Sequence, residues 1–427
     1  MHIKTKSLLL FGLLLVLLAV AAPASLAQEP LLLKVNGDQV HDPQLVLTEG
    51  ISFIPVETFA RFSGAGLEWH SPEEFSLSRA GTSLRLTVGK NIAEVGSATV
   101  ALPRPPFRTG ETVFVPLRLV ATMQGYDVNW EAASQTALLT RTETRDGMSP
   151  SELLVKSNQR IQAVNTYAMD GLMDMQMRMA ADGQSLPEGP MNMKIALSGT
   201  VQYQPMQVHL LETISAAGIP TGPDAMQIEL YMTEEKMYMK VPGQGWVVQP
   251  VPFPAEFWKQ QQDIQSDPLK AMKQLEEMGI LLNFGDDTQL NDQQYYVVNA
   301  SLDKEKFQKV FADMFSQFTP GLSGAGTVPD FSSIIQKLFE KAQMDYYYTV
   351  YINQSTLLSD QINFRLDLGL DINPADFEMN GSSQPDVPKN IGLDLKLNGK
   401  FAIKDIGRPF VAPDVSTAQP APAPALS

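Results

Sequence analysis

Methionine is the residue type in this chain whose number and spacing could support chemistry. Twelve of the 20 methionines lie within residues 169–239, and four alternate in the run Met173-x-Met175-x-Met177-x-Met179. Every second residue of a strand points to the same face, so this run predicts a row of thioethers. Thioether sulfur suits Cu(I), and flexible methionines suit both a wall for varied acyl chains and an irregular core. The composition leaves these three readings open.

A copper site on this face would need sulfur atoms that converge. Successive residues on one face of a strand lie about 6.6 Å apart, at a rise of about 3.3 Å per residue. This spacing argues against one ion, so we expect no metal and no cofactor. The expected partner is a lipid or other apolar ligand. The predicted ligand-binding residues are Met169, Met173, Met175, Met177, Met179, Met193, Trp246, Phe311 and Leu338.

Other catalytic or metal-binding patterns are missing from the sequence. The four histidines are isolated, and the chain has no cysteine, which excludes disulfides, thiol catalysis and thiolate metal sites. Ser63-Gly64-Ala65-Gly66 follows an expected helix, whereas a nucleophile elbow opens one. Since no acid, base or nucleophile constellation is visible, we predict that the protein is not an enzyme.

Charge and the N-terminal residues indicate where the protein works. The net charge is −15 at pH 7, and an acidic surface repels phosphate backbones, so nucleic acid is not an expected partner. Residues 1–27 have a basic start, an apolar run and the small-residue site Ser25-Leu26-Ala27, which predict a signal peptide. A retained signal anchor is the alternative. Both place the rest of the chain outside the cytoplasmic membrane, secreted or associated with the cell surface.

The methionine strand requires a sheet to hold it, and residues 149–405 predict one. Ser149-Pro150 marks the start of a helix, and several long alternating segments follow. We expect a helical insertion at residues 254–265, 268–278, 303–318 and 331–342, and further strands from 345 to 403. Residues 142–148 are the expected linker to the preceding domain, and the Pro/Ala-rich residues 412–427 are expected to be disordered.

Residues 31–141 carry an internal repeat. A strand, a short helix and further strands are expected twice, at a fixed offset of 61 residues (116 − 55). We expect the two halves to share one core and the two tryptophans to be largely buried. The matched pairs are Pro55 with Pro116, Gly64 with Gly125, and Trp69 with Trp130.

This duplicated motif resembles the copper amine oxidase N-terminal-like domain, also called a stalk domain. The motif is an aromatic–aliphatic–Pro step, as in Phe53-Ile54-Pro55, followed by glycine and then tryptophan. In the oxidases this domain is separate from the catalytic domain, so the resemblance implies docking to a cell-wall or envelope protein partner. It implies no copper chemistry.

Residues 149–405 resemble the lipoprotein-carrier and glycolipid-carrier superfamily, and also uncharacterised extracytoplasmic proteins of spore-forming bacteria. The resemblance rests on patterns such as Asn165-Thr166-Tyr167 entering a long strand and Tyr295-Tyr296-Val297-Val298. It implies an antiparallel half-barrel sheet packed on helices around a lipid-sized cavity. The predicted class is therefore α+β, with a small duplicated β-rich domain before the half-barrel.

Three functions follow as hypotheses. The first is a non-enzymatic envelope protein whose stalk-like domain docks it and whose half-barrel binds a lipophilic ligand. The second is a purely structural or interaction protein with a packed, empty half-barrel. The third is a methionine-rich Cu(I)-binding protein.

Overall fold

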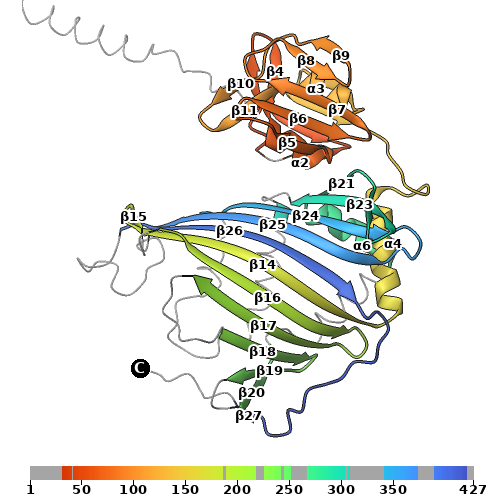
Figure 1. Cartoon of the computed structure of the whole chain (residues 1–427), viewed down its shortest axis with the longest axis vertical. Helices are drawn as coiled ribbons and strands as arrows, with labels where there is room; N and C mark the ends of the chain where they lie inside the picture. Colours follow the sequence, from red (N-terminus) through yellow and green to blue (C-terminus); the bar gives the residue numbers. More distant parts are fainter. Residues whose placement is uncertain are drawn as a thin grey trace, which may run out of the picture.

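The structure is a computed structural model that describes residues 31–40, 42–185, 189–217, 226–241, 245–251, 267–302, 306–307, 341–373 and 389–420. The described chain is rich in strands and contains three small sheets, one long curled sheet and four short helices (Figure 1). This agrees broadly with the α+β class. The predicted signal peptide and the expected helices at 254–265, 303–318 and 331–342 lie outside the described residues, apart from a few terminal positions.

The three small sheets form what we call the small-sheet unit. Its strands are β1 (Leu32–Val35), β2 (Asp38–Val40), β3 (Val46–Thr48), β4 (Ile51–Pro55), β5 (Gly66–Trp69), β6 (Glu74–Arg79), β7 (Thr82–Thr87), β8 (Ile92–Val95), β9 (Ala98–Ala101), β10 (Phe107–Thr109), β11 (Thr112–Pro116), β12 (Asp127–Glu131) and β13 (Thr136–Thr140). Its helices are α2 (Val56–Ser63) and α3 (Leu117–Met123). The series from β1 to β6 recurs as β8 to β13 at the predicted offset of 61, so the repeat covers the whole unit.

The two repeats exchange strands. In one sheet β4 and β11 pair antiparallel, with Ile54 opposite its repeat equivalent Val115, as a local twofold axis requires. In another sheet β1 pairs parallel with β13, from the opposite repeat. In the third sheet β7 joins β6 to β8. Neither half can form these sheets alone, which confirms the expectation of one shared core.

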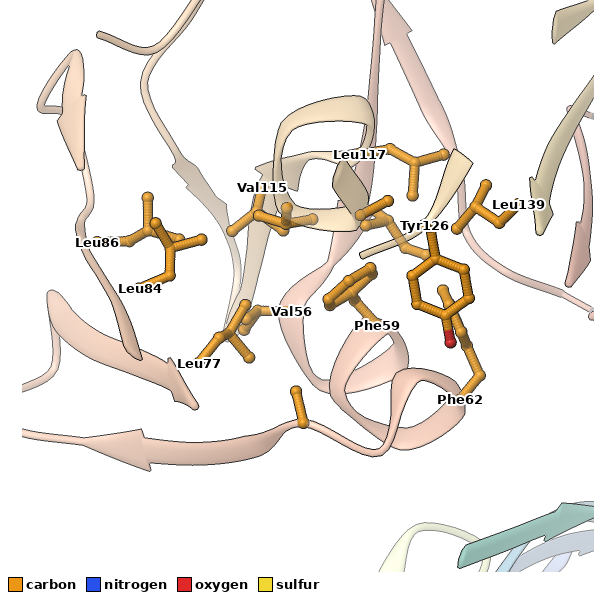
Figure 2. Close-up of a cluster of buried hydrophobic side chains, with 14 of the residues drawn as sticks. Val56, Phe59, Phe62, Leu77, Leu84, Leu86, Val115, Leu117, Tyr126 and Leu139 are labelled. Atoms are coloured by element: carbon orange, nitrogen blue, oxygen red, sulfur yellow. The ribbon is translucent and has the colours of Figure 1, made fainter. Parts of the chain in front are cut away.

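The core of this unit contains side chains from both repeats. Phe59 and Phe62 come from α2, Leu117 from α3 and Leu139 from β13, and all four are essentially buried (Figure 2). The apolar residues of α2 recur at every third position, so they share the helix face that is turned inward. Each large side chain removed from water stabilises the fold by about 1.5–3 kcal/mol.

The helix ends follow the repeated proline and glycine. Pro55 and Pro116 are the residues immediately before α2 and α3, with extended backbone, so each proline precedes its helix and is not part of it. Gly64 ends α2 with φ at 72°, and Gly125 follows α3 with φ at 81°. This left-handed conformation favours glycine because it has no Cβ.

The two repeated tryptophans correct one expectation. Trp69 and Trp130 occupy equivalent strands, β5 and β12, but they are 39% and 40% exposed rather than buried. Each strand lies at the edge of its sheet, so the ring is covered on one side only. The ring of Trp69 packs against Phe75 at a centroid distance of 4.9 Å, with the guanidinium of Arg108 at 6.0 Å.

The long sheet is an antiparallel meander. Its strands are β14 (Thr166–Ala181), β15 (Gln184–Ser185), β16 (Met191–Gln202), β17 (Gln207–Ala217), β18 (Met226–Thr233), β19 (Lys236–Val241), β20 (Gly245–Pro250), β21 (Ile280–Phe284), β22 (Thr288–Leu290), β23 (Gln293–Leu302), β24 (Gln343–Asn353), β25 (Ser359–Ile372), β26 (Ile391–Lys404) and β27 (Gln419–Pro420). The order is β21-β23-β24-β25-β26-β14-β16-β17-β18-β19-β20-β27. The first and last long strands, β14 and β26, therefore pair in the middle of the sheet.

Two helices pack at one end of this sheet. In α4 (Pro150–Ala163), Ser149 accepts from the Glu152 amide, and the Glu152 carboxylate accepts from the Ser149 amide at 2.8 Å. This reciprocal cap confirms the predicted start. In α6 (Pro268–Glu277) the Asp267 carboxylate caps the first turn at 3.0 Å. Leu153 and Leu154 of α4 join a buried cluster with residues of β21, β23 and β24.

The small-sheet unit contacts the β21–β23 hairpin of the long sheet. Leu281 of β21 is 8% exposed and belongs to the buried cluster of the small-sheet unit. The expected linker takes part in this contact, because Arg145 binds Asp287 at 2.9 Å and Glu143 at 2.9 Å. The linker is thus held to the long sheet through Asp287, and it is held to the small-sheet unit through Arg79, which pairs with Glu143.

The C-terminal segment needs a second correction. Residues 412–420, which we expected to be disordered, are described, and β27 pairs in parallel with β20. This short strand covers the edge of β20, whose main-chain groups would otherwise lack partners. Residues 421–427 lie outside the described part of the chain.

Candidate functional site

The methionines of β14 lie on one face of the long sheet, as their alternation predicts. The face continues onto the neighbouring strands because the register places apolar residues side by side. One row across five strands consists of Met193, Met175, Leu397, Leu366 and Tyr346. The next row consists of Met191, Met177, Leu395, Leu368 and Met344. We call the face that carries these two rows the apolar face.

The opposite face of the same strands is mostly polar. Between the methionines of β14 stand Asp170, Asp174, Gln176 and Arg178, all exposed, together with Leu172, which is 70% exposed. The two faces of β14 therefore differ in both polarity and exposure. This division makes the sheet amphipathic, with the methionines on one face and the exposed charged residues on the other.

The side chains of the apolar face are half-buried rather than packed away. All ten residues of the two rows have intermediate exposure, and Met179, at the end of the strand, is 36% exposed. By contrast, Val298, Val350 and Ile352 at the α4 end are at most 3% exposed. The face thus changes from a closed core near α4 to an apolar surface with accessible area across β25, β26, β14 and β16.

Three glycines shape this face. Gly199, Gly171 and Gly399 lie on β16, β14 and β26, each displaced by two residues from the next, so they form a diagonal across the face. A Cβ at any of them would overlap a neighbouring side chain, such as Phe401 at Gly171 and Phe364 at Gly399. Glycine in a strand allows close approach and bending. The diagonal is consistent with the curl of the long sheet in Figure 1.

Aromatic residues that the sequence analysis did not select extend the face. The rings of Phe364 and Phe401 stack at 5.3 Å, and Tyr346 lies 5.7 Å from Tyr348 and 6.5 Å from Phe364. Burial raises the pKa of the Tyr346 and Tyr348 hydroxyls, so both stay neutral at pH 7. The signal for these residues in the sequence was the alternation of apolar and polar residues in the segments 343–353, 361–370 and 391–404.

The predicted ligand-binding residues have different outcomes. Met169, Met173, Met175, Met177, Met179 and Met193 share the apolar face. Trp246 does not: it pairs with Lys240, next to Met239, which belongs to the apolar face, so it lies on the opposite face. There it is 7% exposed, with the Lys240 ammonium 5.6 Å from its ring. Phe311 and Leu338 lie outside the described residues.

The described titratable groups do not assemble a metal centre. Among the residues that the structure describes, no group of three or more His, Cys, Asp or Glu side chains could hold an ion. His209 lies 3.0 Å from Glu229, which also pairs with Lys240 at 2.8 Å. These contacts depress the pKa of Glu229 despite its partial burial, which acts in the opposite direction. They describe a surface ion-pair network.

Within the described ranges, no helix has both the length and the apolar character that crossing a bilayer requires.

Two family models match the sequence. Residues 34–139 match the copper amine oxidase N-terminal domain, and residues 149–383 match a family of unknown function (DUF6612). No significant match was found among curated protein sequences.

Solved structures with a similar course of the chain include three from bacteria. The lipoprotein LppX of Mycobacterium tuberculosis is 9% identical, with 62% of this chain and 100% of that chain covered and a TM-score of 0.28. LprF from Mycobacterium bovis is 11% identical, with 62% and 97% covered and a TM-score of 0.26. A putative outer membrane lipoprotein-sorting protein domain from Vibrio parahaemolyticus is 10% identical, with 60% and 92% covered and a TM-score of 0.19. The match of residues 34–139 agrees with the resemblance that the duplicated motif indicated.

Proposed function

We propose that this chain, which belongs to the family of unknown function DUF6612, binds a lipophilic ligand on the apolar face of its long sheet. The observation that carries the proposal is the half-buried state of the two rows through Met175 and Met177. A continuous apolar surface that stays partly accessible is costly in water. A ligand with an alkyl chain would cover it.

The expected energetics suit an acyl chain. Burying a methylene group contributes about 0.8 kcal/mol, so a chain of a dozen carbons gains on the order of 10 kcal/mol. Association costs at least about 4 kcal/mol, which leaves enough for useful affinity. The flexible methionines of β14 and β16 would adapt to chains of different shape.

The location and the role of the small-sheet unit complete the proposal. The signal-like residues 1–27 support a place outside the cytoplasmic membrane. The match of residues 34–139 to a domain from the N-terminal part of other proteins supports a docking role toward the cell wall or an envelope protein. We propose no catalytic activity, because no group of acid, base and nucleophile appeared in the sequence.

Two alternatives remain distinct in what they predict. In a purely structural protein the apolar face would be filled by the chain itself and would bind no ligand. In a Cu(I)-binding protein the thioethers would hold the ion. The strand register favours the Cu(I)-binding alternative more than the sequence alone did. Met175 lies opposite Met193, and Met177 lies opposite Met191. Directly opposite residues have Cβ atoms about 5 Å apart, closer than successive residues on one strand face.

The proposal is tested with the chain that lacks residues 1–27. The small-sheet unit is kept, because Leu281 completes its core. An environment-sensitive fatty-acid probe should bind with a stoichiometry near one. Met175→Gln should weaken that binding about tenfold, because it places an amide against the alkyl chain. Gln176→Ala, on the opposite face of the same strand, is the matched control and should leave binding unchanged. Absence of saturable binding by the folded protein would favour the structural alternative.

A further inference from the structure

A cavity lies between the small-sheet unit and the polar face of the long sheet. Its volume is about 1090 Å³. Gln39, Gln44 and Arg61 of the small-sheet unit line one side, and polar residues of β14, β24, β25 and β26 line the other. The two parts face each other across this region in Figure 1. We call this cavity the polar cleft.

Charges of alternating sign line the floor of the polar cleft. Arg178 of β14 stands opposite Asp394 of β26. Two residues further along β26, Lys396 stands opposite Asp367 of β25. Directly opposite side chains in a sheet have Cβ atoms about 5 Å apart, so the floor presents cations and carboxylates as near neighbours.

Three of these floor charges have no partner in the described structure. Among the residues that the structure describes, Arg178, Asp394 and Lys396 form no ion pair and no side-chain hydrogen bond, and all three are exposed. The same face forms such pairs elsewhere: Lys404 binds Asp170, and Lys240 binds Glu229. Close opposite charges that stay unpaired inside a cleft are available to a ligand.

The floor also has room and a further acceptor. Gly369 lies between Asp394 and Gln343, and a Cβ there would meet only ordinary contacts of 3.7 Å or more. Asp367 accepts from Arg365 through Oδ2 at 2.9 Å, while its Oδ1 is buried and has no partner among the described residues. Buried acceptors without a donor are rare in folded proteins. A donor supplied by a ligand or water would satisfy it.

The lining indicates the chemistry of the ligand. An anion alone would meet Asp394 and Asp367, and a cation alone would meet Arg178 and Lys396, whereas Arg61 and Asp345 pair with each other across the cleft. A neutral ligand would cover the unpaired charges and leave them without water, which is unfavourable. A molecule with one group of each sign matches the floor, and the amides of Gln39, Gln44 and Gln343 can bind peptide groups.

We propose that the polar cleft binds a peptide that carries both an ammonium and a carboxylate group. The carboxylate lies against Arg178 and Lys396, and the ammonium lies against Asp394. This site is on the opposite face of the sheet from the apolar face, so its occupation does not depend on the lipid proposal. It needs both parts of the chain, because the small-sheet unit supplies one wall.

The test measures peptide binding to the chain without residues 1–27 by titration calorimetry at low ionic strength. The probe is an acetyl-Glu-Ala-Lys-amide peptide, which has one charge of each sign. The comparison peptides replace Glu by Gln or Lys by Gln. We expect one-to-one binding of the probe, at least tenfold tighter than either comparison peptide. Raising the salt concentration should weaken it, because the cleft is open to solvent.

The variants assign each charge to its partner. In Asp394→Asn, the probe should no longer bind more tightly than the peptide that lacks Lys, but it should still bind more tightly than the peptide that lacks Glu. In the double variant Arg178→Gln with Lys396→Gln, the probe should lose its higher affinity over the peptide that lacks Glu and keep it over the peptide that lacks Lys. Lys194→Gln, an exposed lysine of β16 outside the cleft, is the matched control and should change nothing. The proposal is overturned if the probe does not bind, if all three peptides bind equally, or if the neutral probe chitotetraose binds and the substitutions have no effect. Unchanged unfolding midpoints show that each variant is folded.

Discussion

Arg79 of β6 donates a hydrogen bond of 2.7 Å to the main-chain oxygen of Phe284 at the end of β21. The same guanidinium pairs with Glu143, which also binds Arg145. Arg79 is 5% exposed, so this contact joins the small-sheet unit to the long sheet in a place that water hardly reaches. It indicates that the two parts fold and unfold together.

Replacing Arg79 tests this contact. Arg79→Met keeps much of the volume but leaves the Phe284 oxygen and part of the Glu143 carboxylate without a donor. We expect a loss of about 3 kcal/mol in the free energy of unfolding, measured by urea denaturation. Arg85→Met on β7 breaks an exposed pair with Glu74 and should cost less than about 1 kcal/mol. Equal losses in the two variants would contradict a buried junction.

Gly64 and Gly125 offer a comparison within the repeat. Both have a positive φ, so alanine is strained at either site by about 1–2 kcal/mol. They differ in their neighbours: a Cβ on Gly64 would collide with the Phe284 oxygen, whereas one on Gly125 would meet only Arg141 at 3.8 Å. Gly64→Ala should therefore lower the thermal unfolding midpoint clearly more than Gly125→Ala. A similar shift for both would mean that the small-sheet unit does not rest on β21.

Stability at alkaline pH should depend on Tyr296. A hydrogen bond to the Asp146 carboxylate at 2.6 Å, with burial as the second cause, raises the pKa of the Tyr296 hydroxyl to about 12. The unfolded chain loses this proton near pH 10, whereas the folded chain keeps it, so the stabilisation is present below pH 10 and is lost between pH 10 and 12. Tyr296→Phe should flatten the fall in unfolding free energy over that range. Parallel profiles for both proteins would contradict this.

Local sequence patterns predicted the features that are determined by residues close together in the chain. The start of α4 at Ser149 was visible because a capping side chain acts on residues two or three positions away. The period-two run through Met175 fixed the two faces of β14. The repeat was visible because the same proline and glycine positions are needed twice.

The features that the sequence did not predict depend on the pairing of strands that are far apart in the chain. The exposure of Trp69 and Trp130 depends on which strands become sheet edges, and no local pattern contains that information. The placement of Trp246 on the polar face depends on the register of β19 and β20. The contact of Leu281 with the core of the small-sheet unit joins residues far apart in the sequence. Such contacts are set by the assembled fold.

The methionines should act as an apolar wall. We expect the purified protein to carry no stoichiometric copper by elemental analysis. Replacing Met175, Met177, Met191 and Met193 together by Leu should preserve the binding of a fatty-acid probe within a few fold, because leucine keeps the face apolar. One copper per chain that is lost in this variant would instead identify the four thioethers as ligands, since the register places them as two opposed pairs.

The central claim is that the apolar face binds an alkyl chain, and photo-crosslinking tests it most directly. A fatty acid with a diazirine in its chain is bound to the protein, activated by light and located by peptide mass spectrometry. The account predicts labels on β14, β16, β25 and β26 at residues of the two rows, such as Met175, Leu366 and Leu397, with loss of label when unmodified fatty acid competes. Labels confined to the polar face or the small-sheet unit, or labels that do not respond to competition, would contradict it.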